Sequence, residues 1–325
     1  MKTGISYFGV RNPRHVKKDL EEIKQNNITF VVHTFSENDK EYYLDTMKEI
    51  VNLTQEMGLE VYIDPWGVAR IFGGEAYSKF IAMNDDARQV TKEGKKGYGA
   101  CMNNPLTEKF IGEWLEAARY IGADYIFWDE PHFSPFTNKE GCFCDICRDI
   151  YERERGGDLL KAGSEELRWM RGYTKLNFLK KMIRKAHEMG MKNALCVLPY
   201  DRDVDWENLA GIPELDVFGT DPYWFMLKGD FEEETRNFAK KVAELSKKYG
   251  KEGQIWIQGF RVKSGEEWKV RRVAEIAYEE GIRNLASWSF RGTEYMSYIR
   301  SENPELVWKT LGEVYGELLE KDGNP

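Results

Sequence analysis

Two carboxylates stand side by side at the end of an apolar run in this sequence. Phe127 and Trp128 are followed directly by Asp129 and Glu130, and Pro131 comes next. A strand whose carboxyl end carries acidic side chains is typical of the catalytic face of an eight-stranded α/β barrel. Because proline disfavours a helical conformation of the residue before it, we expect Glu130 to be extended and not to begin a helix. The pair is therefore predicted to do proton-transfer chemistry in an active site.

Four cysteines provide a second candidate site. Cys142, Cys144 and Cys147 form a C-x-C-x-x-C run soon after the acidic pair, and Cys101 precedes the pair. Four thiolates satisfy the tetrahedral coordination of a structural Zn²⁺ ion, whereas disulfides are rare in the cytosol. We expect one structural Zn²⁺ that ties the loop after the acidic strand to the start of the preceding helix, with four free thiols as the alternative. The fifth cysteine, Cys196, is expected to be a small buried side chain.

Short apolar runs alternate with amphipathic, helix-like segments along the whole chain. The runs are rich in Ile, Val, Phe, Tyr and Trp, as expected of parallel strands that are covered on both faces. Asn12-Pro13 and Asn104-Pro105 are typical helix starts, and 264–267 has the pattern of a capping box. Eight strands with helices between them predict the α/β class and a single (β/α)8 TIM barrel over residues 1–325, with long loops at 65–102 and 131–163. The expected strands are 4–10, 28–33, 60–64, 125–129, 194–198, 217–221, 254–258 and 285–289.

Polar and aromatic side chains fall at or just beyond the carboxyl ends of these strands. For any one of these residues taken alone, a structural role is the simpler interpretation. An aspartate is often a helix cap, and a lone histidine such as His33 is more often a core residue whose hydrogen bonds are satisfied. Together, however, they are expected to converge on the catalytic face. The candidate catalytic residues are Glu130, Asp129 and Asp221. The candidate substrate-binding residues are His33, Asp64, Trp66, His132, Tyr223, Gln258, Trp288 and Arg291.

Carboxylates next to aromatic rings suggest carbohydrate chemistry. Cleaving a glycosidic bond requires a carboxylic acid that protonates the leaving oxygen, and Trp and Tyr offer flat apolar faces to sugar rings. We therefore expect a glycoside hydrolase that acts on short oligosaccharides or glycosides.

Five segments together resemble glycoside hydrolase family 42, the β-galactosidases with a TIM barrel and a cysteine zinc cluster. They are 101–105, 128–131, 142–147, 221–223 and 288–292. The resemblance implies that Glu130 is the acid/base and that the four cysteines hold zinc. It covers the barrel only, because 325 residues leave no room for that family's trimerisation and C-terminal β domains. A distant relative is therefore expected rather than a member.

Two departures from the family pattern leave the mechanism open. Asp129 stands where the family has Asn, and Gln258 falls where it has its nucleophilic Glu, so the amide is expected to bind a sugar hydroxyl instead. One route is substrate-assisted, with Asp129 orienting a 2-acetamido group and Glu130 as acid. In the others, Asp221 or Asp64 is the base of an inverting reaction or the nucleophile of a rearranged retaining one. A carboxyl separation of roughly 5 Å favours retaining and 6.5–9.5 Å favours inverting.

Composition and charge limit the remaining choices. A net charge of −8 disfavours nucleic acid or an anionic membrane as partner and fits a small carbohydrate better. No apolar run approaches the length of about 18 residues needed to cross a membrane, and no signal peptide is evident, so a cytoplasmic location is expected. The abundance of Lys and Glu has a thermophile character. A homo-oligomer is left open.

Two other function classes compete with a glycoside hydrolase. A catalytically inactive, sugar-binding barrel would explain the lost nucleophile. A metal-dependent barrel hydrolase is disfavoured, because the chain has four histidines and only His33 and His132 are well placed.

Overall fold

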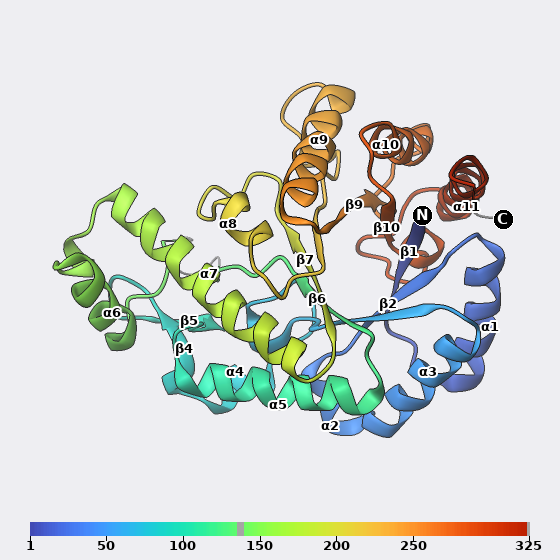
Figure 1. Ribbon diagram of the computed structural model, residues 1–325. Helices are drawn as coiled ribbons and strands as arrows, with labels where there is room; N and C mark the ends of the chain where they lie inside the picture. The colour runs from blue at the N-terminus through green and yellow to red at the C-terminus, as the bar shows by residue number, and fades with distance from the viewer. Residues whose placement is uncertain (135–139, 324–325) are drawn as a thin grey trace.

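The computed structural model describes residues 1–134 and 140–323. Eight parallel strands close into a barrel in the order β1-β10-β9-β8-β7-β6-β3-β2, with helices around it (Figure 1). The predicted (β/α)8 TIM barrel is therefore confirmed. The barrel strands are β1 (Lys2–Tyr7), β2 (Phe30–Thr34), β3 (Glu60–Asp64), β6 (Tyr125–Asp129), β7 (Lys192–Val197), β8 (Val217–Thr220), β9 (Glu252–Gln258) and β10 (Asn284–Trp288).

The helices that cover the barrel begin and end mostly where the sequence indicates. Asn12 and Asn104 cap α1 and α5 with their side chains, as predicted, and Gly122 ends α5 in the left-handed conformation. The capping box at 264–267 was wrong: α10 begins at Trp268, and the Glu267 carboxylate accepts the Gly265 N–H instead. The covering helices are α1 (Pro13–Gln25), α2 (Glu37–Tyr42), α3 (Leu44–Glu56), α5 (Pro105–Ile121), α7 (Ser164–Glu188), α8 (Trp206–Ala210), α9 (Phe231–Tyr249), α10 (Trp268–Glu279) and α11 (Pro304–Lys321).

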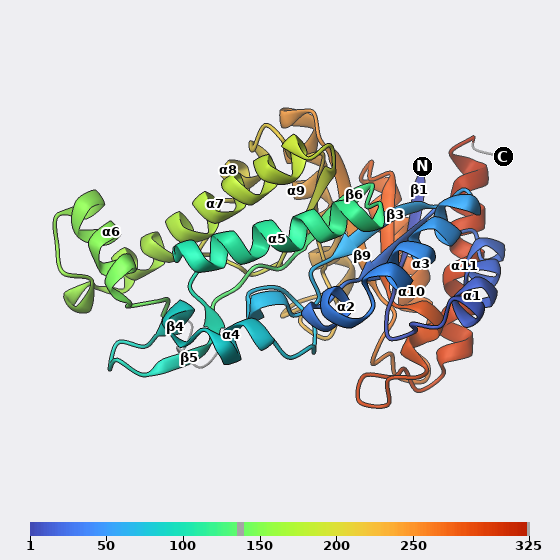
Figure 2. The same ribbon diagram turned by 90° about the horizontal axis from the view of Figure 1, so that it is seen from below.

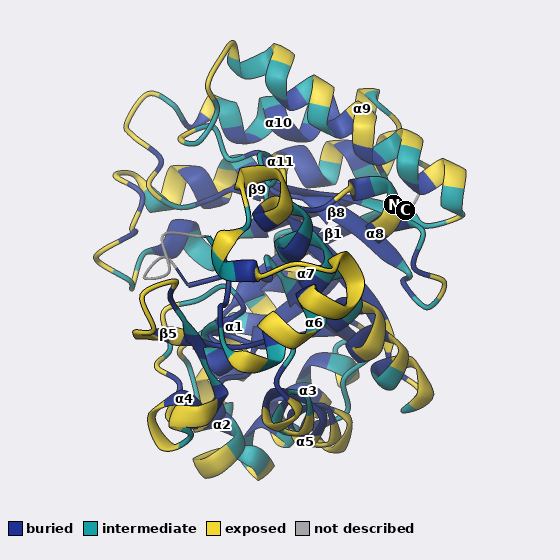
Figure 3. Ribbon diagram, turned by 90° about the vertical axis from the view of Figure 1, so that its left-hand side faces the viewer, coloured by how far each residue is buried: buried dark blue, intermediate teal, exposed yellow. Residues whose placement is uncertain are grey.

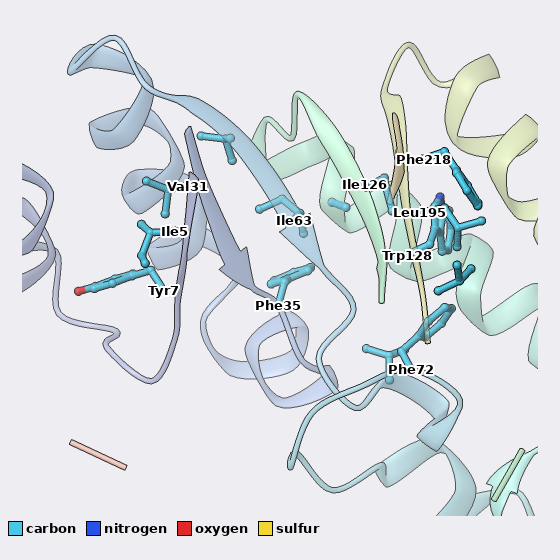
Figure 4. Packing of buried hydrophobic residues seen from close by; sticks show 14 of the residues in the cluster. Ile5, Tyr7, Val31, Phe35, Ile63, Phe72, Ile126, Trp128, Leu195 and Phe218 are labelled. Carbon is cyan, nitrogen blue, oxygen red and sulfur yellow. The ribbon is translucent and has the colours of Figure 1, made fainter. Parts of the chain in front are cut away.

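Alternation along the strands creates two cores. Residues that point into the barrel, such as Phe30, Tyr62 and Phe127, form one buried cluster. Their neighbours one position along, such as Val31 and Ile63, pack outward against the helices, and Figure 4 shows members of this larger outer cluster. Because side chains alternate between the two faces of a strand, the position of a strand-end residue decides whether it faces the barrel mouth.

The two long segments expected as loops contain regular structure. After β3 come α4 (Lys79–Met83) and an antiparallel hairpin of β4 (Arg88–Val90) and β5 (Lys96–Ala100). After β6 comes α6 (Asp145–Arg155). The hairpin, α6 and the start of α7 extend away from the barrel on one side, as Figures 1 and 2 show. We call residues 85–102 and 140–170 the cysteine lobe.

The cysteine lobe has a small core of its own. Phe133, Phe143 and Tyr151 pack around the cysteines, together with Leu167 and Met170 of α7. The outer face of the lobe is largely exposed, whereas the barrel strands behind it are buried (Figure 3). In the part of the chain that the structure describes, no helix combines the length and apolarity needed to span a membrane.

Candidate active site

Five inward-facing residues end five neighbouring or opposed strands. Side chains alternate between the inside and the outside of the barrel along each strand. Four of the residues stand two positions after a residue of the inner barrel core, and the fifth stands four positions after one, so all five side chains face the barrel mouth. The five residues are Asp64, Asp129, Asp221, Gln258 and Trp288. The closed barrel brings these five strand ends to one end of the molecule.

A pocket of about 210 Å³ opens at this end of the barrel. Its acidic wall includes Asp129 and Glu130, and its aromatic wall includes Trp66, Tyr223 and Trp288. The rings of Trp66 and Trp288 are nearly parallel, with centroids 5.1 Å apart. The pocket therefore combines carboxyl groups with flat apolar surfaces. Its other lining residues are Gly73, Gly74, Glu75, Phe260, Arg261 and Ile299.

Glu130 reaches this pocket because its backbone leaves the strand conformation. Its φ is +41°, in the left-handed region, so the extended conformation expected from Pro131 was wrong. In a continuing strand, Glu130 would point to the opposite face from Asp129. The left-handed turn lets both side chains line one pocket, at a cost of the order of 1–2 kcal/mol for a non-glycine residue.

Hydrogen bonds hold the Glu130 backbone in this conformation. Its N–H donates to the Cys196 carbonyl at 3.2 Å. The Nδ1 atom of His132 lies 2.8 Å from the Glu130 carbonyl, and the His132 N–H donates to Ile71 O at 2.9 Å. His132, a candidate substrate ligand, therefore contacts the acid's backbone and supports its position.

Buried negative charge dominates the electrostatics below the pocket. Burial raises the pKa of Asp64 well above its ordinary value, and the charges of Asp129 and Glu130 raise it further. Burial and the charge of Glu130 likewise raise the pKa of Asp129 and of Asp221. No group in the described residues hydrogen-bonds either carboxyl oxygen of Asp64. Burial and mutual repulsion therefore favour the protonated forms of these three carboxyl groups, and perturbed carboxyl groups of this kind cluster at functional sites.

We expect Asp64→Asn to stabilise the protein increasingly as pH rises. The unfolded chain ionises Asp64 at its ordinary pKa of about 3.9, whereas folding raises that pKa. As the pH rises above the pKa of Asp64 in the unfolded chain, the free energy of unfolding therefore falls by up to about 1.4 kcal/mol per pH unit. The fall ends at the pKa of Asp64 in the folded protein. Urea unfolding of wild type and variant from pH 4.5 to 8 measures this gap. Asp86→Asn, at a side chain that is 96% exposed, is the control. A gap that does not widen more than that of the control would contradict the expectation.

Two candidate ligands, His33 and Arg291, do not line the pocket and have polar partners elsewhere. His33 points outward, its Nε2 lies 2.9 Å from Thr54 Oγ1 of α3, and burial with the charge of Arg11 lowers its pKa to about 3. Arg291 forms ion pairs with Glu22 and Glu294, both at 3.1 Å.

Gln258 faces inward, and its side-chain amide hydrogen-bonds the backbone of two loops. Its Oε1 accepts the Phe225 N–H at 3.3 Å and its Nε2 donates to Phe260 O at 2.9 Å. It therefore fastens the loops after β8 and β9, and it is buried and does not line the pocket, so the structure does not place it where it would meet a sugar hydroxyl.

The segment after β3 supplies pocket residues that the sequence analysis missed. The Gly73 N–H donates to the Asp129 carbonyl at 3.1 Å, and a Cβ atom at Gly73 would lie 2.0 Å from Asp129 Oδ2. Only glycine allows this close approach. Glu75, two residues later, adds a carboxyl group whose pKa is raised by burial. The Gly-Gly-Glu sequence at 73–75 was the available signal. Arg261, also missed, lines the same pocket from the segment after β9.

Glu37 of α2 fixes this segment to the barrel. Its carboxylate accepts hydrogen bonds from Ala69 N at 2.8 Å, Ser78 Oγ at 2.6 Å and Phe80 N at 2.8 Å. Charged acceptors make stronger hydrogen bonds than neutral ones, so these contacts hold the pocket wall in place.

The four predicted cysteines do come together. Their Sγ atoms all lie within 4.8 Å of one another, and those of Cys101 and Cys147 are 3.5 Å apart. A tetrahedral Zn²⁺ with Zn–S bonds of about 2.3 Å separates sulfurs by about 3.8 Å, so the set fits a metal such as zinc. The Val90 N–H donates to Cys142 Sγ at 3.4 Å and Asn103 Nδ2 to Cys147 Sγ at 3.3 Å. Such donors stabilise thiolates that bind a metal.

Comparisons with known proteins agree with the barrel. No family model and no curated protein matches the sequence. A β-galactosidase from the psychrophilic Marinomonas ef1 matches with a TM-score of 0.73 and 11% identity, over 100% of this chain and 61% of that chain. An endo-1,4-β-mannanase from Rhizomucor miehei matches with a TM-score of 0.67 and 8% identity, over 97% of this chain and 95% of that chain. The chain has the barrel fold of these glycosidases.

A third similar structure is a GH20 exo β-N-acetylglucosaminidase from Vibrio harveyi, solved with N-acetylglucosamine. Its TM-score is 0.56 at 10% identity, over 99% of this chain and 58% of that chain. This chain thus spans about three fifths of the β-galactosidase and of the N-acetylglucosaminidase. At such identities the likeness extends to the fold, and the chemistry must be argued from the pocket.

Proposed function

We propose that the protein is a glycoside hydrolase that acts on short oligosaccharides or glycosides, with Glu130 as the general acid/base. The observation that carries this proposal is a pocket that Asp129 and Glu130 both line and that Trp66, Tyr223 and Trp288 wall. A sugar ring packed on the aromatic wall would present its glycosidic oxygen to a carboxylic acid. The shared fold with solved glycosidases supports the same function.

The assisting group is best assigned to Asp129. It lines the pocket beside Glu130, whereas Asp64 and Asp221 are buried beneath it at 0% and 2% exposure. Gln258 cannot form a glycosyl ester. In the proposed reaction the carbonyl oxygen of a 2-acetamido group bonds to the anomeric carbon while the glycosidic C–O bond breaks and Glu130 gives its proton to the leaving oxygen. Glu130 then takes a proton from the water that opens the cyclic intermediate. Asp129 orients the acetamido N–H, and Asp221 positions Glu130.

Glu75 provides the alternative second carboxyl group. It lines the same pocket from the segment after β3, unlike Asp64 and Asp221. An inverting reaction would use it as the base that activates water on the far side of the sugar.

The choice between Asp129 and Glu75 can be tested by two isosteric variants. We expect Asp129→Asn to lower kcat by about 10²-fold or more on a 2-acetamido sugar and Glu75→Gln to change it by less than about 10-fold, because only the first orients the attacking group. NMR of the fresh product should show retained anomeric configuration. An inverted anomeric configuration, together with a larger loss of kcat in Glu75→Gln than in Asp129→Asn, would assign the assisting role to Glu75.

We also propose one structural Zn²⁺ held by Cys101, Cys142, Cys144 and Cys147. Four thiolates leave no open coordination position, so the ion would stabilise the cysteine lobe and take no part in catalysis. The histidines do not favour a metal-dependent hydrolase, because His33 points outward and His132 contacts a backbone carbonyl. The cytoplasmic location, the thermophilic source, the homo-oligomer and the absence of nucleic-acid or membrane partners remain predictions.

A further inference from the structure

We propose that the substrate is an uncharged oligosaccharide and that its further sugar units bind in a second cavity, across Trp66 from the catalytic pocket. This inference rests on the proposed function and deepens it. The second cavity has a volume of about 860 Å³, and Trp66 lines both cavities. It lies between the loop after β1, the end of β2 with α2, and the segment after β3. The second cavity is therefore separated from the catalytic pocket by one side chain, which is the distance that neighbouring units of one sugar chain would have to span.

The sizes of the two cavities suit different parts of one ligand. The catalytic pocket, at about 210 Å³, is smaller than the roughly 300–1,000 Å³ typical of small-molecule sites. It therefore suits one sugar unit. The second cavity lies within that range and can take more than one. Because Trp66 is a wall of both, the two cavities are neighbours on the same face of the barrel.

Exposed aromatic rings line the second cavity. Tyr42 is 67% exposed, Tyr43 is 40% exposed and Tyr77 is 94% exposed. Rings of this kind offer a flat apolar face with a hydroxyl at the edge, which matches the C–H faces and hydroxyl rims of sugars. Tyr42 and Tyr43 lie at the end of α2, whereas Tyr77 lies in the segment after β3, so a ligand could contact rings on more than one side.

The charges of the second cavity are paired within the protein. Arg11 binds Asp39 through two hydrogen bonds, of 2.6 and 2.7 Å, and Lys79 binds Glu41 at 2.5 Å. Glu37 is occupied by its three donors. A phosphate or a polyanion would find no unpaired cation on these residues, and a polycation no unpaired carboxylate. Hydroxyl groups can share such paired groups as donors and acceptors, so an uncharged carbohydrate fits best.

The test compares chain lengths in three proteins. Wild type, Tyr77→Ala and the control Tyr120→Ala, at an exposed ring on α5, are assayed for hydrolysis of aryl monoglycosides. They are also assayed with chito-, manno-, gluco- and galacto-oligosaccharides of two to five β-1,4-linked units. Calorimetry with the same sugars measures binding in the Glu130→Gln background. We expect affinity to rise with the second and third units in wild type and Tyr120→Ala. We expect Tyr77→Ala to lose about 3- to 10-fold of that gain, the size of one aromatic contact.

The outcomes separate this inference from the proposed function. Cleavage of monoglycosides with no gain from added units would overturn the second cavity and leave the hydrolase intact. Length-dependent binding without hydrolysis would support the cavity and overturn the hydrolase. An equal loss in Tyr77→Ala at every chain length would overturn the cavity, as would a wild-type dimer that Tyr77→Ala dissociates in sedimentation, because a second copy would then be the occupant.

Discussion

Replacing Glu130 with glutamine is expected to lower kcat/KM on an unactivated disaccharide by about 10²–10⁴-fold, the usual contribution of a positioned general acid. The amide keeps the shape of the side chain but has no acidic proton to give. Glu130 lines the pocket only because its backbone takes a left-handed conformation, and His132 and Cys196 hold that backbone from two sides. The loss should appear mainly in kcat, because the proton moves in the transition state.

The control for this variant is Glu188→Gln, at an exposed position at the end of α7. It should leave kcat/KM unchanged, and neither variant should unfold at a lower urea concentration than the wild type. A fully active Glu130→Gln enzyme on an unactivated disaccharide would remove Glu130 from the reaction.

Loss of one zinc ligand is the second large expected effect. We expect Cys144→Ser to abolish stoichiometric zinc binding and to destabilise the cysteine lobe by at least about 5 kcal/mol, since structural zinc sites contribute of the order of 10 kcal/mol to folding. The lobe core is small, and it is built around the cysteines themselves. Hydrogen exchange should therefore accelerate in 140–170 while the barrel strands stay protected, because local stability differs between the two regions.

Cys196→Ala is the matched control. Cys196 lies inside the barrel, in the inner core, and not in the cysteine cluster. This variant should retain one zinc per chain by elemental analysis and wild-type exchange in the lobe. Wild-type protein that carries well under one zinc per chain, purified without chelator, would contradict the metal site itself.

The barrel and the inward strand ends could be predicted from sequence because they depend on local patterns. Apolar runs located β3 and β6, and their carboxyl ends indicated Asp64 and Asp129; in the structure both residues occupy inward positions. The prediction for His33 was wrong because it depended on the exact end of its strand. The expected strand ended at His33, but β2 continues to Thr34 and His33 occupies an outward position. A shift of one residue moves a side chain to the other face.

The rest of the site depends on tertiary contacts that leave no periodic signal. Nothing local predicts the left-handed backbone of Glu130, because Pro131 favours an extended residue before it. Glu75 and Arg261 lie on irregular segments. The segment that carries Glu75 is held by hydrogen bonds to Glu37 of α2. The cysteine lobe could be anticipated from its ligand spacing, but its hairpin and α6 could not be anticipated from the expected loops.

The most direct test of Glu130 as proton donor is how the loss of kcat/KM in Glu130→Gln depends on the acidity of the leaving group. Wild type and Glu130→Gln are compared on a series of aryl glycosides of one sugar, from strongly to weakly acidic phenols, and on the unactivated disaccharide. A good leaving group needs no proton, so we expect the wild-type to variant ratio of kcat/KM to be below about 10 for the most acidic phenol. The ratio should climb to about 10²–10⁴ for the disaccharide. A ratio that stays constant across the series would contradict general-acid catalysis by Glu130.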